Sequence, residues 1–484
     1  MINWNVFLFF LYSFILFVLI LETPNKIVHI REYPYIFGLV GFIGIYRYGM
    51  WLAHLIRAQI YERYFYKKVR KNADSIQEER WKPERLYFMI VSFLEEKEIL
   101  SNSIKSIIQE ARSLNLPVTI CMGTASAHDE KIVSSVIGHD DKVKIIFVRQ
   151  ELPDKRLQIG RALRALVRQG VGKNDPVIFM DGDSVIYPGC LRKCLPVFHI
   201  CPDVDALTTN EKAVVMNSWL LSNILSLRFA IRNFHMHSLA LSRKVLCLTG
   251  RFSIFRGSRI IEESFISRIE YDYICDWYWE KIKFLSGDDK STWYSLLERG
   301  SNMLYVPDAY IYSIEKVRSN PVKKYINDLQ RWGGNMLRNN LRALQLGPRR
   351  TGFFTWFVLL DQRMSMWTAI FSPILIILMS FKSLKLTYML ILWVLLVRYL
   401  QSLLLFYYGG KINSTFPILL YFNQVLNGVI KIYMLFHLSL QRWNDQNIPA
   451  TQSTTNQKIE LLTAKYITIL YIIIFFLIIN AATS

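Results

Sequence analysis

Long apolar runs at both ends of the chain set its first division. Residues 4–21 contain no charged side chain, and a second apolar run covers 35–56. Further apolar runs near the C-terminus cover 366–381, 386–408, 416–438 and 466–480. The stretch 353–360 is also apolar but is too short to cross a bilayer alone. Because about 20 apolar residues span a bilayer as a helix, we expect two N-terminal and four C-terminal transmembrane helices, with three C-terminal helices as the alternative.

Between these runs, short apolar stretches alternate with amphipathic ones. The expected strands are 86–93, 116–123, 142–149 and a fourth that ends in the segment 176–183, and the expected helices are 96–114, 128–138 and 159–169. This alternation predicts an α/β domain whose parallel sheet is covered by helices. Ligands of such sheets bind at the carboxyl ends of the strands.

The pattern divides the chain into four parts. They are two transmembrane helices in 1–56, a cytoplasmic α/β domain in 57–320, an amphipathic interfacial helix in 321–350, and a transmembrane channel region in 351–484. The orientation follows from six basic residues in 57–72, directly after the second apolar run. Short basic loops stay on the cytoplasmic side of a membrane, so we expect the α/β domain to be cytoplasmic.

Composition agrees with a membrane protein and limits the partners. Hydrophobic residues make up 52% of the chain, and its formal net charge is +20. Such a charge favours anionic lipid or an acidic substrate, and no recognition motif supports nucleic acid. The six cysteines include no C-x-x-C pair, so we expect buried thiols in place of a zinc site or a disulfide framework.

Two aspartates, Asp181 and Asp183, flank Gly182 at the end of the fourth expected strand. Asp-Gly is also common turn chemistry, so the motif alone leaves a structural turn open. The alternative is a site for Mg²⁺ or Mn²⁺, since hard cations are held by one or two carboxylates together with substrate phosphates. The nearby basic residues Lys155 and Arg156 precede a helix, where anions bind well, and are candidates for a diphosphate site.

A second carboxylate pair, Asp288 and Asp289, follows Gly287 and opens another expected helix. These side chains are helix N-caps in one interpretation and a general base in the other. Further along, Arg331 and Trp332 lie on a basic amphipathic helix typical of a membrane surface.

The order of these motifs resembles that of processive family 2 glycosyltransferases, the family of cellulose and hyaluronan synthases. The resemblance implies a GT-A-type domain inserted between transmembrane helices. It implies that Asp183 binds the metal and Asp181 the donor. Asp289 is then the catalytic base, oriented by Asp288. One departure is Asp328, which stands where the family has Gln or Arg.

The same resemblance implies roles for the basic and aromatic residues of the motifs. Lys155, Arg156 and Arg331 would bind the donor diphosphate, and Trp332 the acceptor sugar. Ser92 and Glu95, near the end of the first strand, are candidates for the donor nucleotide.

Longer segments are similar to bacterial alginate polymerases, the mannuronan synthase catalytic subunits. They include GIYRYGMWLAHLIR (44–57), RFAIRNFHMHSLALSRKVLCLTGRFSIFR (228–256), IKFLSGDDKS (282–291) and LLDQRMSMW (359–367). This resemblance implies a GDP-mannuronate donor, a growing β-1,4-linked mannuronan chain and a place in the bacterial inner membrane. It also implies a membrane-anchored co-polymerase subunit that binds cyclic di-GMP.

A uronate polymer carries one carboxylate per sugar, and several cations suit such a product. Arg251 and His235 are candidates for the acceptor carboxylate. Arg363, Arg398 and Lys431 lie in the C-terminal apolar region, where charges are costly and usually face a cavity or a partner; we expect them to line the channel. The alternatives are synthesis of another polysaccharide from a UDP- or GDP-sugar, and a non-catalytic transporter or receptor.

Overall fold

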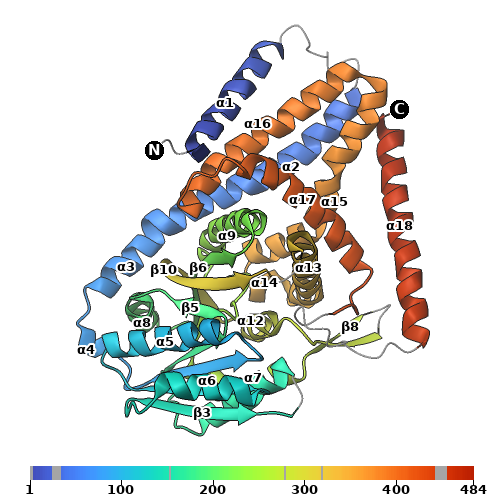
Figure 1. The fold of residues 1–484 in the computed structure, drawn as a ribbon. Helices are drawn as coiled ribbons and strands as arrows, with labels where there is room; N and C mark the ends of the chain where they lie inside the picture. The colour runs from blue at the N-terminus through green and yellow to red at the C-terminus, as the bar shows by residue number, and fades with distance from the viewer. Residues whose placement is uncertain are drawn as a thin grey trace.

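The computed structural model describes residues 4–23, 34–151, 154–276, 280–317, 320–441 and 455–483. An α/β domain lies at one end of a group of long helices, as Figure 1 shows. These helices are α1 (Trp4–Leu21), α2 (Pro34–Ile60), α15 (Phe353–Lys382), α16 (Leu384–Gly409), α17 (Phe416–Leu435) and α18 (Thr455–Thr483).

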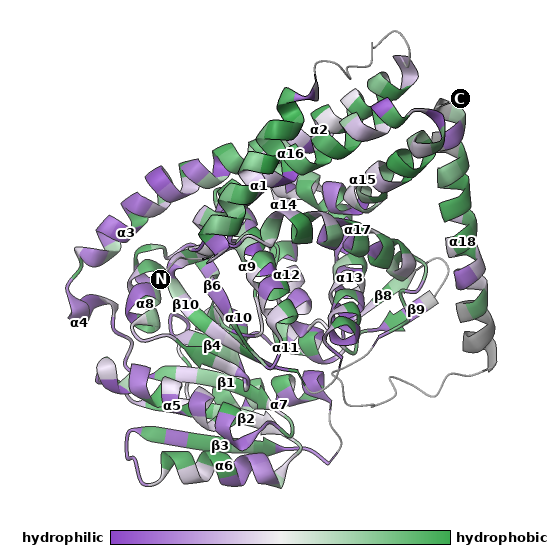
Figure 2. Cartoon of the chain, turned by 45° about the horizontal axis from the view of Figure 1, so that its top comes forward, coloured by the Kyte–Doolittle hydropathy of each residue, from purple (hydrophilic) through white to green (hydrophobic). Residues whose placement is uncertain are grey.

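The long helices have the length and composition of membrane spans. Within the described ranges five of them qualify, namely α1, α2 with its continuation, α15, α16 and α17, and α18 adds the shorter apolar segment Lys465–Leu477. Large apolar side chains such as Trp4, Phe10 and Phe14 are exposed on α1, and Figure 2 shows apolar residues along the outer helices. Exposed apolar surface of this extent is typical of a protein in lipid.

Two helices differ from the predicted spans. The second runs past residue 56 as a single rod of 41 residues, Pro34–Asp74, through the π-helical turn η3 (Tyr61–Tyr66) and α3 (Lys67–Asp74). In the C-terminal region, 353–360 and 366–381 belong to the one helix α15. The polar residues between them continue the helix, and the charge of Asp361 is compensated by Arg47 of α2 at 3.1 Å.

The α/β domain contains an eight-stranded sheet of order β3-β2-β1-β4-β7-β6-β10-β5. Its strands are β1 (Leu86–Ser92), β2 (Val118–Thr124), β3 (Val143–Arg149), β4 (Pro176–Asp181), β5 (Ser184–Ile186), β6 (Val204–Met216), β7 (Ser253–Arg256) and β10 (Asn302–Lys316). Strands β1 to β4 are parallel, whereas β7 runs antiparallel to both β4 and β6. The predicted parallel α/β half is therefore confirmed, and it continues into a mixed half that the alternating pattern did not indicate.

The remaining elements surround this sheet. They are α4 (Glu78–Trp81), α5 (Lys97–Ser113), α6 (Ala127–Ile137), α7 (Lys155–Val167), α8 (Cys190–Ile200), α9 (Trp219–Ala240), α10 (Gly257–Ile260), α11 (Glu263–Glu270), α12 (Asp288–Glu298), α13 (Pro321–Gln345), α14 (Gly347–Thr351) and the hairpin of β8 (Tyr273–Asp276) and β9 (Glu280–Lys283). Helix α7 begins earlier than predicted because the Asp154 side chain accepts hydrogen bonds from the main-chain N–H groups of Arg156 and Leu157, which caps the helix.

Helices α9 and α13 connect the sheet domain to the long helices. Helix α9 packs on β6, α2 and α16, and α13 packs against α12, α15 and α17. Many residues of α13 are buried, including Gly333, Gly334 and Asn335. Helix α13 therefore has protein neighbours in both the sheet domain and the long helices, and the interfacial position predicted for 321–350 stays a prediction.

Candidate active site

The D-G-D motif lies at the carboxyl end of β4, in the middle of the sheet. Gly182 follows β4, and its N–H donates to the main-chain oxygen of Val91 in β1 (3.1 Å). A Cβ at Gly182 would lie 3.1 Å from Cβ of Ser92, so the glycine lets the turn sit directly on the end of β1. This arrangement places Asp181 and Asp183 at the edge where parallel sheets bind ligands.

The carboxylates of this motif carry an excess of negative charge. Asp183 lies near Asp181 and Glu315, and burial together with these two charges raises the pKa of Asp183 to about 6. Within the described residues no group of three or more His, Cys, Asp or Glu side chains forms a ready metal site. Two carboxylates are nevertheless what Mg²⁺ or Mn²⁺ needs when substrate phosphates complete the coordination. The residues present therefore fit a divalent cation that binds together with a diphosphate.

Lys155 joins the two carboxylate motifs. Its Nζ lies 2.9 Å from Oδ1 of Asp181 and 3.3 Å from Oδ2 of Asp288. Burial opposes the charge of Lys155, but Asp181 and Asp288 hold its pKa above the usual range. D-G-D and G-D-D, which are far apart in the sequence, thus meet at one cation near the start of α7.

The two aspartates of G-D-D have different environments. Burial raises the pKa of Asp288, but Lys155 and Arg156 outweigh it and bring the pKa below the usual value. For Asp289, burial and the neighbouring charge of Asp288 raise the pKa. Such a separation within a carboxylate pair is typical of acid–base sites, and it makes Asp289 the better proton acceptor.

Cys247 is a residue of this site that the sequence analysis missed. Its Sγ donates to Oδ2 of Asp289 at 3.0 Å, while the main-chain N–H of Lys290 donates to the other carboxylate oxygen (2.8 Å). These contacts hold the carboxylate in one orientation. Cys247 lies in the segment LCLTG, which belongs to one of the longer segments of the resemblance. No local spacing in the sequence indicates that Cys247 and Asp289 meet.

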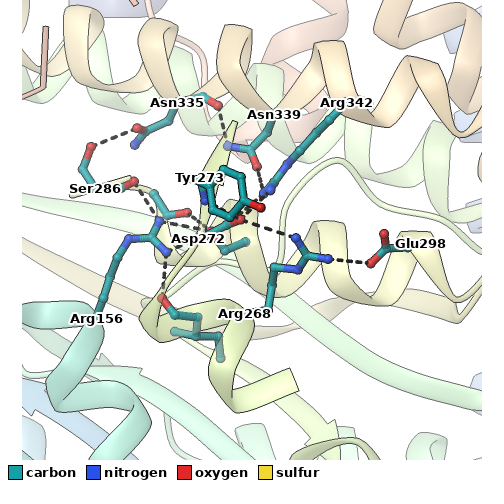
Figure 3. Close-up of polar contacts among 12 residues, drawn as sticks. Arg156, Arg268, Asp272, Tyr273, Ser286, Glu298, Asn335, Asn339 and Arg342 are labelled. Carbon is teal, nitrogen blue, oxygen red and sulfur yellow. Dashed lines mark hydrogen bonds and ion pairs between the residues drawn. The ribbon is translucent and has the colours of Figure 1, made fainter. Parts of the chain in front are cut away.

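Arg156 is placed differently from the prediction. Its guanidinium is buried and donates to the main-chain oxygens of Ile269 (2.9 Å) and Ser286 (3.0 Å) and to the Ser291 hydroxyl (3.1 Å). Figure 3 shows Arg156 directed toward the loop that contains Ser286. With these donors committed, its position favours support of the G-D-D turn over contact with a diphosphate.

The same buried network ties α13 to the G-D-D turn (Figure 3). Arg342 of α13 donates to both carboxylate oxygens of Asp272 at 2.6 and 2.7 Å. The Ser286 hydroxyl donates to Oδ1 of Asn335 (2.9 Å), and a Cβ at Gly287, where φ is +83°, would lie 2.8 Å from the Asn335 side chain. Because the turn and α13 are in direct contact, α13 positions the carboxylate pair.

The Arg-Trp motif lies on the same helix. Arg331 pairs with Asp328 at 3.0 Å, so the residue that departs from the family pattern holds the arginine of the motif. The guanidinium of Arg228, from α9, lies 3.3 Å above the centre of the Trp332 ring. One face of Trp332 is therefore covered, and only the other can take a sugar.

The remaining donor and acceptor candidates have defined positions. Ser92 donates to Asp129 (2.8 Å) beside Gly182, and Glu95 is half-buried in the loop after β1. Arg251 lies near Glu211 and Glu315 (3.5 Å each), on the side of Asp183. This position favours a role at the carboxylates of D-G-D over the predicted acceptor contact.

His235 and the predicted channel cations lie toward the long helices. The ring of His235 contacts that of His54 in α2 at 4.7 Å, against a membrane helix. Arg363 donates to the main-chain oxygen of Leu337 in α13 (3.1 Å), and Arg398 donates to Gln401 (2.5 Å). Lys431 lies beside Gly333. Of these residues Lys431 is the one in contact with the Arg-Trp segment.

Comparisons with known proteins identify the family. Residues 83–335, just over half of the chain, match the family described as Glycosyltransferase like family 2. The protein named Glycosyltransferase alg8 from Pseudomonas syringae pv. tomato is 36% identical over 90% of this chain and 89% of its own length. Glycosyltransferase alg8 from Azotobacter vinelandii is 33% identical over 92% and 90%.

One solved structure is similar to the chain at low identity. The mannosyltransferase PcManGT from Pyrobaculum calidifontis, in complex with GDP-Man and Mn²⁺, is 13% identical, covers 82% of this chain and 98% of its own, and has a TM-score of 0.45. The predicted GT-A-type domain accompanied by apolar helices and the predicted family are both confirmed. The chain belongs to glycosyltransferase-like family 2 and is a relative of the alg8 glycosyltransferases over nine tenths of its length.

Proposed function

We propose that the chain is a membrane-embedded, processive, inverting glycosyltransferase that polymerises mannuronic acid from GDP-mannuronate into β-1,4-linked mannuronan. The observation that carries this proposal is Lys155, which bridges the two carboxylate motifs through Asp181 and Asp288. Donor-binding and base motifs therefore share one site. The resemblance to bacterial alginate polymerases supports the choice of donor.

On the donor side, Asp183 would hold Mg²⁺ or Mn²⁺ together with the diphosphate, and Asp181 would bind the donor. A bound divalent cation neutralises charge that develops on the leaving diphosphate. Lys155 and Arg331 bind the same diphosphate, and their positive charges stabilise GDP as it departs. Ser92 and Glu95, at the end of β1, are the candidates for the nucleotide.

On the acceptor side, Asp289 removes the proton from the attacking hydroxyl. The acceptor oxygen bonds to the anomeric carbon as the bond to the diphosphate breaks on the opposite face, which inverts the configuration. Cys247 keeps Asp289 oriented. Asp288 is ionised beside Lys155, and its negative charge keeps the pKa of Asp289 above that of Asp288. Trp332 offers its uncovered face to the acceptor sugar.

The polymer then leaves through the membrane helices of the same chain. We place the catalytic domain in the cytoplasm and the protein in the bacterial inner membrane, because of the basic segment after the second span. Arg363, Arg398 and Lys431 provide positive charge along the exit path. A membrane-anchored subunit that binds cyclic di-GMP is the proposed partner.

The test is donor turnover in membranes that contain the full chain, with and without the cyclic di-GMP-binding subunit. GDP release from GDP-mannuronate with Mg²⁺ or Mn²⁺, together with a product cleaved by a mannuronate-specific lyase, is the expected result. Asp183→Asn should lose the cation-dependent signal. Turnover of a UDP-sugar alone would replace the mannuronan assignment by another polysaccharide, and absence of any turnover with every donor would favour a transporter or receptor.

A further inference from the structure

Among the residues that the structure describes, no carboxylate pairs with Arg228, which lies beside Trp332, or with Lys431, which lies beside Gly333. Arg228 lies over one face of the indole, and Lys431 of α17 lies against Gly333, where an added Cβ would be 3.5 Å from the lysine Cγ. The side chains of Arg228, Trp332 and Lys431 are half-buried and keep accessible surface. They come from α9, α13 and α17, which pack against one another.

The acids near these cations are already paired with other bases. Glu211 lies 3.2 Å from Arg232 and 3.5 Å from Arg251. The next acid, Asp328, lies 3.0 Å from Arg331 and 3.7 Å from Lys324.

On the membrane side, Asp361 accepts from Tyr46 (2.7 Å) and pairs with Arg47 (3.1 Å). Across the described ranges, no carboxylate forms a direct ion pair with Arg228 or Lys431. Burial lowers the pKa of Arg228 to about 10, so Arg228 stays protonated at neutral pH.

This unpaired charge lies near the segment that carries the proposed base. The electrostatic neighbours of Lys431 include Arg228 and also Lys290, the residue that follows the proposed base Asp289. Arg228 of α9 and Lys431 of α17 therefore bring positive charge to the region where α9, α13 and α17 pack together. A guanidinium binds a carboxylate through two parallel hydrogen bonds, and an ammonium adds a point charge.

We propose that Arg228 and Lys431 form an anion subsite that binds the carboxylate of a uronate residue at the acceptor end of the polymer, next to the sugar that stacks on the uncovered face of Trp332. The subsite rests on the proposed function, because it assumes an acceptor beside Trp332. It gives the enzyme a means to distinguish a uronate chain from a neutral one, which Trp332 alone does not provide because stacking on an indole is indifferent to a distant carboxylate.

The test measures oligosaccharide binding to the detergent-solubilised full-length protein. The probes are a β-1,4-linked oligomannuronate and the neutral β-1,4-linked oligomannose of equal length. Wild type should prefer the oligomannuronate, and Arg228→Gln and Lys431→Gln should each reduce that preference about tenfold with little change for the neutral probe. Arg112→Gln, which removes an arginine of the exposed pair with Asp140, is the control for lost charge.

GDP binding by each variant reports folding, and Arg228→Lys, which keeps the charge, should retain much of the preference if Arg228→Gln fails to fold. Wild-type preference in both Gln variants, or no preference in wild type, overturns the subsite. Donor turnover is measured separately. If wild type consumes GDP-mannuronate while both Gln variants keep their preference, the subsite is wrong and the function stands. If wild type binds the oligomannuronate selectively but requires another donor, the subsite stands and the proposed donor is wrong.

Discussion

Replacing Arg342 with methionine should test the buried connection between α13 and the G-D-D turn. Arg342 binds Asp272 through two hydrogen bonds of 2.6 and 2.7 Å, and the Asp272 side chain is fully inaccessible. The guanidinium also lies 3.8 Å above the ring of Tyr294. Methionine keeps an apolar stem of similar volume but leaves the carboxylate without its main partner.

The expected cost follows from the burial of the pair. Removing one partner of a buried ion pair costs about 3–5 kcal/mol, because a charge remains in a poorly solvated place. Arg268, 3.9 Å from Asp272, and the Ser291 hydroxyl compensate in part, which favours the lower end. At about 2–4 °C per kcal/mol for a domain of 150–250 residues, a cost at the lower end should reduce the melting midpoint by roughly 6–12 °C.

The assay is thermal unfolding of the solubilised full-length protein, followed by tryptophan fluorescence, with GDP release measured in parallel. Arg112→Met is the matched control, because its exposed pair with Asp140 (2.7 Å) is screened by solvent and should hardly shift the midpoint. Activity should fall in Arg342→Met below the melting range, since the G-D-D turn loses its support. The reasoning is refuted if Arg342→Met has the same melting midpoint as the control. It is also refuted if the stability losses of Arg342→Met and Asp272→Asn are additive in the double variant, because residues in one network do not act independently.

Three further changes probe the site and the exit path. Asp289→Asn should abolish sugar transfer but leave GDP binding near that of wild type, because a base acts mainly in the transition state; normal turnover would remove Asp289 from the mechanism. Cys247→Ala removes a hydrogen-bond donor that lowers the pKa of Asp289, so the pKa of this base should rise. Activity falls when Asp289 becomes protonated, and the variant should therefore lose activity at a higher pH than wild type. Cys247→Ser should restore the profile, and identical profiles for all three proteins would exclude the contact. Arg398→Leu should shorten the polymer at steady state while GDP release over the first turnovers stays near normal, and unchanged polymer length would place Arg398 outside the exit path.

Local pattern was sufficient for the strands that carry D-G-D. β1 to β4 are short apolar runs between helices, and their order along the chain determines that Asp181 lies at a carboxyl edge. Local pattern was insufficient for Arg156 and Cys247. The first is a basic residue at a helix start, which ordinarily faces solvent, and only the packing of α11 and α12 around it makes it a buried support. The second meets Asp289 through a tertiary contact across 42 positions.

The sign of charge changes across the site, and this change bears on which polymer is made. The carboxylates of Asp181 and Asp183 lie on the donor side, where a divalent cation and a diphosphate suit them. Beyond Trp332, toward the membrane helices, Arg228 and Lys431 have no carboxylate partner in the part of the chain described. A neutral polymer makes no use of such cations, and placing them near membrane depth is costly. A product with a carboxylate on every sugar neutralises each cation in turn as it passes, so the same feature that would be a defect in a cellulose synthase is an advantage for a uronate polymer.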